Sequence, residues 1–267
     1  MKKTFRRFAP VAIVLIGLAT LSFMAKDEIM LRLHPQQGKS YTVNSKATSM
    51  SMMEVQGQTM NMTQAMETNQ SFTIKEATDT QSVIESQIES LKMSISQMGM
   101  KFEYDSEHPE KTSPMIADQT KEFEKEIKKP VDFTYDAMGN MISEKDEESM
   151  NSLGNVIIKM PEEPISEGST WTTSNTQGVS GMEFTVEFTY TVTSISKKSI
   201  EVSFNGNILK NDDNITGTYN GTASINPATG IITKSSTKSN VSMTISEQGL
   251  SIPMTINGNS TVTVAEK

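Results

Sequence analysis

Twenty of the 267 residues are methionine, and their clustering is the first feature of this sequence that could support chemistry. Nine of them lie between residues 50 and 100: Met50, Met52, Met53, Met60, Met62, Met66, Met93, Met98 and Met100. If Gly57 is the tip of a hairpin, strands over 48–55 and 58–66 bring many of these thioethers together across the ladder. Thioethers are soft ligands that suit Cu(I), so a Met-rich Cu(I)-binding protein is one hypothesis.

The competing hypothesis is that methionine serves here as a flexible apolar side chain, filling a core or lining an adaptable binding surface. We favour it, because no Cys exists and neither His lies near the cluster. We therefore predict no metal site and no cofactor.

Residues that could act in catalysis do not form a recognisable motif. His34 and His108 each precede a proline, which favours loop or turn backbone. His108 follows Asp105, Ser106 and Glu107, but neighbours in one loop cannot normally adopt the geometry of a catalytic triad. There is also no Gly-x-Ser-x-Gly turn. We expect no enzymatic activity; a hydrolase with paired carboxylates in one cleft is the least favoured alternative.

Acidic clusters also have simple structural interpretations. Glu144, Asp146, Glu147 and Glu148 lack the alternating spacing and the glycine of a calcium loop, and they suit the start of a helix. The run 211–214 is typical of a polar hairpin tip. The net charge of −8 argues against a nucleic-acid partner, because such binding relies on clustered Lys and Arg.

The first 25 residues have the pattern of an export signal. Lys2, Lys3, Arg6 and Arg7 precede an apolar run over 11–25, which is shorter than the roughly 20 residues of a membrane span. We expect residues 1–25 to be a signal peptide or, if uncleaved, an N-terminal anchor and the only contact with the membrane. Cleavage would change the net charge from −8 to −12, since four basic and no acidic residues would leave. The predicted location is the periplasm or cell surface.

Period-2 alternation dominates the chain after residue 39. It is clearest over 182–192, where Phe184, Val186, Phe188, Tyr190 and Val192 share one face and polar residues the other. Such a pattern predicts a half-buried antiparallel strand. The same reasoning predicts strands over 71–75, 82–88, 131–135, 200–204, 216–225, 231–245 and 252–264.

Two helices are predicted within this sheet protein. The first follows Ser113-Pro114 and ends before Pro130, with Ile116, Phe123 and Ile127 on one side. The second begins after Ser143 and ends at Pro161, with a stripe formed by Met150, Leu153, Ile157 and Met160. Each helix is expected to cover a face of the sheet with its apolar stripe.

Short motifs recur along the chain and suggest two related halves. Gln37-Gly38-Lys39-Ser40-Tyr41-Thr42 matches Glu167-Gly168-Ser169-Thr170-Trp171-Thr172, each opening a strand with an aromatic residue. We assign residues 28–160 to a first β half that carries both helices, and residues 161–267 to a second β half, within one continuous domain. The predicted fold is mainly β: a curved antiparallel sheet or half-barrel with two helices packed on it.

Four further motifs carry a resemblance to a known family. They are Gly38-Lys-Ser-Tyr41, Phe102-Glu-Tyr104-Asp105-Ser106, Val131-Asp-Phe-Thr-Tyr-Asp136-Ala-Met-Gly139 and Met160-Pro161-Glu-Glu-Pro164-Ile-Ser-Glu-Gly168-Ser-Thr-Trp171. In this order they resemble a family of exported bacterial proteins known only as a domain of unknown function. The resemblance implies a wrapped antiparallel sheet, distantly similar to the half-barrels of periplasmic lipoprotein carriers. It implies no catalytic residues.

The function that these features favour is a non-enzymatic envelope binding module. Its partner would be an apolar small molecule or lipid, or an envelope protein. The candidate ligand-binding residues are Met60, Met62, Met66, Phe184, Phe188 and Tyr190. The alternatives are a structural or adhesive surface protein, whose core would enclose no cavity above about 300 Å³, and the Cu(I)-binding protein described above.

Overall fold

The computed structural model describes residues 28–55, 57–142, 152–179, 182–209, 214–247 and 250–267. The predicted export segment, the acidic run at 144–148 and most of the loop over 211–214 lie outside these residues. None of the helices in the described ranges is long and apolar enough to cross a membrane.

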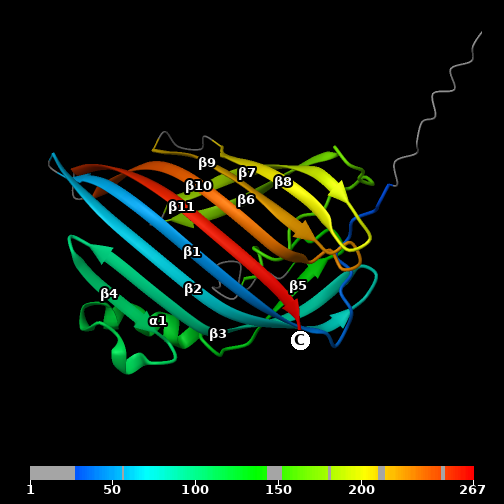
Figure 1. Cartoon of the computed structure of the whole chain (residues 1–267), viewed down its shortest axis with the longest axis horizontal. Coiled ribbons are helices and arrows are strands. Elements are labelled where there is room, and N and C mark those ends of the chain that lie inside the picture. Colours follow the sequence, from blue (N-terminus) through cyan, green and yellow to red (C-terminus); the bar gives the residue numbers. More distant parts are fainter. Residues whose placement is uncertain (1–27, 56, 143–151, 180–181, 210–213, 248–249) are drawn as a thin grey trace, which may run out of the picture.

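Long antiparallel strands make up most of the described chain, as the alternating sequence predicted (Figure 1). They are β1 (Ser40–Val55), β2 (Gln58–Ala77), β3 (Gln81–Gln97), β4 (Met100–Asp105), β5 (Val131–Asp136), β6 (Thr170–Val179), β7 (Met182–Ile195), β8 (Ile200–Ile208), β9 (Ile215–Ile225), β10 (Ile232–Glu247) and β11 (Leu250–Glu266). Every strand predicted from the alternation is present.

The strands form one 11-stranded sheet in the order β4-β3-β2-β1-β11-β10-β9-β8-β7-β6. β5 also pairs with β3, over a different stretch of β3 from the one that pairs with β4. The first and last strands are neighbours in the middle of the sheet, paired from Tyr41 opposite Glu266 to Met53 opposite Met254. The sheet therefore runs without a break across the predicted boundary between the two halves.

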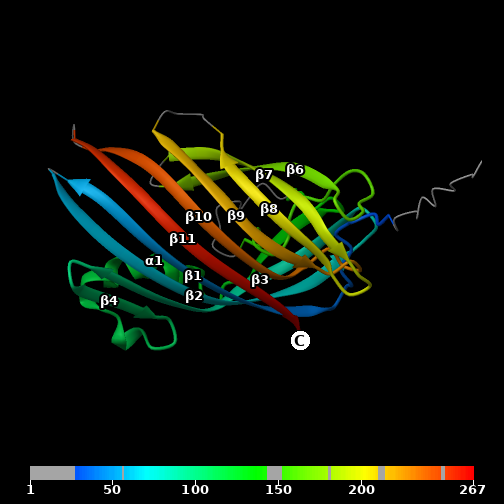
Figure 2. The same cartoon turned by 45° about the horizontal axis from the view of Figure 1, so that its top comes forward.

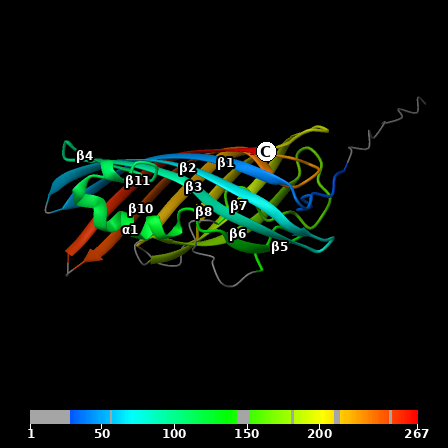
Figure 3. The ribbon, with the colours of Figure 1, turned by 90° about the horizontal axis from the view of Figure 1, so that it is seen from below.

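The sheet curves around a concave face, which we call the trough (Figures 1 and 2). Seen from below, β1 and β2 lie along one side of the molecule and β6 along the other (Figure 3). Among the described residues, β6 pairs only with β7, so the curved sheet is unclosed. This confirms the predicted fold class.

Strand alternation sends the large apolar residues into the trough. Phe184, Val186, Tyr190 and Val192 of β7 are all buried, whereas Glu183 and Glu187 on the opposite face are exposed. Tyr41 and Trp171, the aromatic residues near the start of β1 and β6, each stack on an aromatic ring of the neighbouring strand. Tyr41 stacks on Phe72 of the neighbouring strand with centroids 4.7 Å apart, and Trp171 stacks on Tyr190 at 4.9 Å.

One end of the trough is filled by two segments outside the strands, residues 29–33 and 153–165, which we call the plug. Ile29 and Ile165 join the two segments through a pair of backbone hydrogen bonds of 2.9 and 2.8 Å. The plug side chains pack with inward residues from both halves of the sheet in the largest apolar cluster. The buried plug residues are Leu31, Leu33, Leu153, Val156, Ile157, Met160, Pro161 and Ile165.

Two smaller clusters bound the rest of the trough. Phe184, Val186, Ile215, Val241 and Met243 pack together on the inner side of the β7–β11 portion of the sheet. The other cluster joins the inner face of β3 and β4 to the helix region. The space between these clusters and the plug is where the trough can remain open.

The first predicted helix is confirmed. A 3₁₀ turn at Pro114–Ile116 leads into α1 (Ala117–Glu126), and Ile116, Phe123 and Ile127 pack against the β3–β4 cluster as their spacing predicted. A further 3₁₀ turn spans Pro109–Lys111. Ser113 does not cap the helix with its side chain; instead its Oγ accepts a hydrogen bond from the Glu103 N–H.

The second predicted helix is wrong over residues 152–160, which form a turn and irregular backbone. Leu153, Ile157 and Met160 are buried as predicted, but in the plug. Tertiary partners take the backbone groups that a helix would need. The Val156 carbonyl accepts from the Ile232 N–H at 3.0 Å, and the Lys159 carbonyl accepts from Trp171 Nε1 at 3.0 Å. The remainder of that prediction lies outside the described residues.

Candidate functional site

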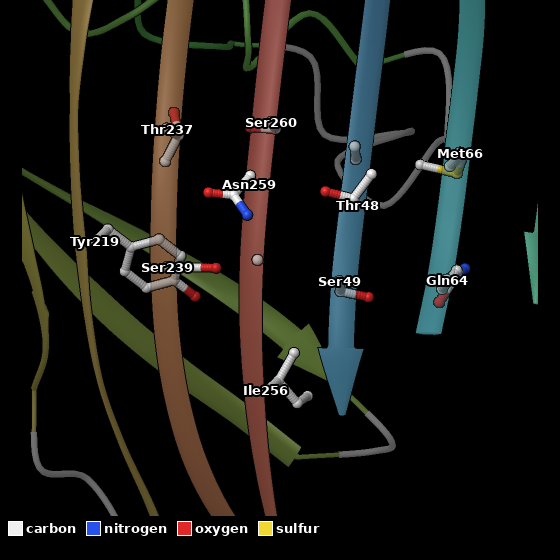
Figure 4. A pocket seen from close by; sticks show the side chains of 12 residues that line it. Thr48, Ser49, Gln64, Met66, Tyr219, Thr237, Ser239, Ile256, Asn259 and Ser260 are labelled. Atoms are coloured by element: carbon white, nitrogen blue, oxygen red, sulfur yellow. The ribbon is translucent and has the colours of Figure 1, made fainter. Parts of the chain in front are cut away.

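The centre of the trough contains an open hollow of about 290 Å³. It spans five neighbouring strands from β9 to β2, as Figure 4 shows. Tyr219 lies at one side of the hollow and Met66 at the other. The lining residues are Ala47, Thr48, Ser49, Gln64, Met66, Tyr219, Thr237, Ser239, Ile256, Gly258, Asn259 and Ser260.

The hollow exists because the inward positions at the centre of these strands carry small side chains. Two rows of directly opposed residues cross the sheet here. One runs Gln64, Ser49, Gly258, Ser239 and Tyr219; the other runs Met66, Ala47, Ser260, Thr237 and Gly221. Small residues in the middle of each row, with Gln64 and Tyr219 at the ends of the first and Met66 at one end of the second, leave a depression over β1, β11 and β10. At the other end of the second row, the Phe204 ring occupies the space that a side chain at Gly221 would use.

Gly258 and Ser239 fix the floor of the hollow. A Cβ at Gly258 would lie 2.5 Å from Ser239 Oγ, so the serine hydroxyl lies over the space that a side chain at 258 would use. Among the described residues, no side-chain hydrogen bond ties the hydroxyls of Ser49, Ser239 or Ser260 to the protein. These hydroxyls are therefore not committed to side-chain hydrogen bonds within the protein.

An aromatic strip forms the wall on the β9 side. Phe188 lies next to Tyr219, with ring centroids 5.8 Å apart, and next to Phe204 at 6.1 Å. Phe204 in turn contacts Tyr190, which stacks on Trp171. Burial raises the pKa of Tyr219, so its hydroxyl stays protonated and able to donate at neutral pH.

A row of methionines crosses the trough beyond the hollow, near the hairpin tip at Gly57. Met60, Met53, Met254 and Met243 are directly opposite one another on β2, β1, β11 and β10. We call these four residues the methionine row. The predicted hairpin is present, but alternation places Met50 and Met52 on the convex face, where they are 47% and 41% exposed. The methionines of the sequence cluster are thus divided between the two faces.

The six predicted ligand-binding residues all lie on the concave face, but only Met66 lines the hollow. Met60 belongs to the methionine row, and Met62 lies between that row and the hollow on β2. Phe188 packs against Tyr219 on the side away from the hollow. Phe184 is buried in the β7–β11 cluster, and Tyr190 is buried in the aromatic strip. The structure therefore brings Met62 and Met66 close to the hollow on one side and Phe188 on the other.

Most residues of the hollow were missed by the sequence reasoning because they are small or polar. A signal for them exists in the alternation: inward positions over 45–51, 235–239 and 258–260 carry Ser, Thr, Ala or Gly instead of large apolar residues. Such an interruption in the middle of several paired strands marks a place where the core is not filled.

Of the residues that the structure describes, none with a charged side chain lines the hollow. Across the described residues, no three His, Asp or Glu side chains gather in a way that could hold a metal ion. The chemistry that this arrangement offers is apolar contact, from Met66, Ile256 and Tyr219, combined with neutral hydroxyl and amide groups.

Comparison with protein families supports the resemblance seen in the motifs. The model of a family of unknown function (DUF6263) matches residues 136–232, which run from the end of β5 to the start of β10. No curated protein matches the chain.

Among solved structures, the chain is similar to one described as showing lipid–protein interactions in lipovitellin. The similarity has a TM-score of 0.50 at 13% identity and covers 87% of this chain but only 26% of the lipovitellin chain. At this identity the similarity concerns the fold alone, a large curved antiparallel sheet. This chain spans about a quarter of the lipovitellin chain.

Two other matches are much weaker. An outer membrane channel from Pseudomonas putida F1 matches 87% of this chain and 98% of its own, with 8% identity and a TM-score of 0.27. A putative outer membrane lipoprotein-sorting protein domain from Vibrio parahaemolyticus matches 84% of this chain and 85% of its own, with 9% identity and a TM-score of 0.17.

Proposed function

We propose that the protein is a non-enzymatic binding module of the cell envelope that holds an apolar molecule in the hollow of its trough. The observation that carries this proposal is the hollow itself. Its volume of about 290 Å³ is just below the roughly 300–1,000 Å³ that small-molecule sites occupy. It is open along the trough, so an elongated ligand can extend beyond it towards Met62.

The apolar character of the wall supports a ligand of this kind. Met66 is 36% exposed although it points into the concave face, and Ile256 and Tyr219 are only partly buried. Covering apolar surface gains roughly 25 cal/mol per Å² removed from water. A ligand that covers these three side chains would complete the apolar surface of the trough between the plug and the β7–β11 cluster.

An envelope location is part of this proposal and rests on the sequence. The basic residues of the first seven positions and the apolar run over 11–25 are typical of an exported chain. The chain contains no cysteine, so an oxidising compartment could not form unwanted disulfide bonds in it.

Binding of Nile red, a neutral apolar dye, tests the proposal. We expect the dye to bind the wild-type protein and to bind Ser260→Phe at least tenfold more weakly, because a phenyl group at 260 fills the hollow. The matched control is Thr261→Phe, which adds the same group at the adjacent, exposed position on the convex face. Ala47→Leu provides a second filling variant if Ser260→Phe unfolds.

Native mass spectrometry of protein isolated from an envelope fraction gives an independent measurement. A co-purifying apolar molecule that is lost in Ser260→Phe supports the proposal. If no ligand is retained and Nile red binds all variants equally or not at all, a structural or adhesive surface protein is the better account.

A Cu(I) site is the second candidate, and the methionine row favours it. Met53 lies directly opposite Met60 on one side and Met254 on the other, and opposed side chains have Cβ atoms about 4.5–5.5 Å apart. Three thioethers so placed could bind one soft cation.

A Cu(I) competition titration tests this second candidate. A copper site at the methionine row predicts a dissociation constant below about 1 μM that is lost when Met53, Met60 and Met254 are all replaced by Leu. Replacement of the exposed Met50, Met52 and Met100 by Leu is the control. Weaker binding, or equal binding by the two triple variants, would exclude a copper site at the methionine row.

A further inference from the structure

We propose that the molecule held in the hollow is an uncharged lipid bearing a hydroxyl or ester group, and that the hollow selects against anionic lipids. This inference rests on the proposed function, because it names the class of ligand for the same site. It comes from the distribution of charge between the two faces of the sheet.

Charged side chains are absent from the inward positions of the central strands. In the described residues, no inward position of these strands carries Asp, Glu, Lys, Arg or His. The ranges are 41–55 of β1, 60–74 of β2, 184–192 of β7, all of β8 and β9, 235–245 of β10 and 252–264 of β11. Within these ranges, the charged residues lie on the convex face. Lys46 and Glu67, for example, form an exposed ion pair there at 3.1 Å.

A ligand carboxylate or phosphate inside the hollow would therefore have no cation to pair with. Transferring an ionised group away from water without a partner is strongly unfavourable, so an anionic lipid would have to hold its headgroup outside the hollow. An uncharged headgroup does not meet this penalty.

The polar groups of the hollow match a neutral headgroup. Ser49, Ser239 and Ser260 present hydroxyls that can donate or accept, and Tyr219 presents a protonated phenol. Gln64 supplies an amide whose Nε2 contacts only a weak acceptor, Met93 Sδ, at 3.7 Å among the described groups. An alcohol or an ester carbonyl can form hydrogen bonds with such groups while its chain contacts Met66 and Ile256.

Three probes with the same hydrocarbon chain test the inference by displacement of Nile red at pH 8: oleyl alcohol, methyl oleate and oleate. We expect the alcohol and the ester to displace the dye from the wild-type protein at concentrations at least tenfold lower than oleate. Equal displacement by all three overturns the inference but leaves the proposed function intact. If Nile red does not bind, or none of the probes displaces it, the proposed function itself fails.

A positive charge placed in the hollow should weaken the preference for uncharged probes. In Ser239→Lys the new ammonium faces the ligand, so we expect oleate to displace Nile red at a concentration at least fivefold lower than in the wild type. The control Asn240→Lys adds the same charge at the adjacent exposed position on the convex face and should leave the preference unchanged. Ser49→Lys is a second test from another strand if Ser239→Lys does not fold. If every folded inward variant leaves the preference unchanged, the inference is wrong.

Discussion

Gly206 lies directly beneath the ring of Phe188 on the concave face of the sheet. A Cβ at Gly206 would be 2.6 Å from Phe188 Cε1, closer than real Cβ atoms approach a neighbour, and 3.2 Å from Tyr219 Cβ, which is a tight contact. The absence of a side chain at 206 is thus what lets Phe188 lie flat and pack against Tyr219, which forms one wall of the hollow.

We expect Gly206→Ala to lower the free energy of unfolding by about 1–3 kcal/mol, because the added methyl group forces the Phe188 ring to move. The change should also weaken Nile red binding through Tyr219. Urea denaturation measures the first effect and dye titration the second. Asn205→Ala, on the exposed face next to it, should stay within about 0.5 kcal/mol of the wild type. Equal stabilities of the two variants would contradict the packing described here.

Arg32 holds the two segments of the plug together. Its guanidinium donates hydrogen bonds to the carbonyl oxygens of Pro161 at 2.6 Å and Glu162 at 2.8 Å. We expect Arg32→Met, which keeps most of the aliphatic length, to lower the free energy of unfolding by about 1–3 kcal/mol, since a charged donor to two carbonyls is lost. Chemical denaturation of Arg32→Met and of Lys197→Met, an exposed turn residue, gives the comparison. No difference between the two would show that the plug does not depend on this contact.

Replacing Leu153 measures how much the irregular plug contributes to the packing of the core. Its side chain is fully buried, so Leu153→Ala should lower the free energy of unfolding by about 2–5 kcal/mol through lost burial and a residual cavity. Ser152→Ala, next to it, should have little effect. A loss below about 1 kcal/mol in Leu153→Ala, measured by denaturant titration, would mean that the plug adds little to the core.

The burial of Tyr190 should make the folded protein less stable at alkaline pH. Burial raises the pKa of Tyr190 to about 12, and a hydrogen bond with the Thr173 side chain opposes this only in part. In the unfolded chain the phenol titrates near pH 10. Between these values the unfolded state releases a proton that the folded state keeps, so the free energy of unfolding falls as pH rises from about 10 to 12. Below pH 10 this group adds no pH dependence.

We therefore expect Tyr190→Phe to reduce the alkaline loss by up to about 1.4 kcal/mol per pH unit between pH 10 and 12. Thermal unfolding at pH 8, 10, 11 and 12 measures the difference. Burial also raises the pKa of Tyr135 to about 12, so some alkaline loss should persist in the variant. Parallel stability curves for Tyr190→Phe and the wild type would refute the role of Tyr190.

Local sequence patterns were sufficient to predict the strands, because a half-buried strand repeats every two residues. Phe184 through Val192 is the clearest example, and its predicted inward residues are buried or packed inside the trough. The helix at Ala117–Glu126 was also predictable from a local pattern, because Ile116, Phe123 and Ile127 are spaced seven and four residues apart, as on one face of a helix.

The second helix failed because apolar spacing does not show which partner will take the backbone hydrogen bonds. Leu153, Ile157 and Met160 are buried in an irregular plug, and nothing local distinguishes that from a helix stripe. The hollow is only partly visible in the sequence, as small inward residues within several separate strands. Its position depends on the pairing of β1 with β11, a contact between residues far apart in the chain, which aligns Ser49 with Gly258 and Ala47 with Ser260.

The pairing of β1 with β11 also has a consequence for how the chain folds. Until the last strand is in place, β1 presents a long unpaired edge beside the hairpin that it forms with β2, and β10 presents another. The part of the sheet that contains β1 and β2 and the part that contains β10 therefore stay unjoined until β11 pairs with both. Until then, each exposed edge can pair with a strand of another molecule. Slow assembly, with a need for protection from aggregation, is built into the order of the sheet.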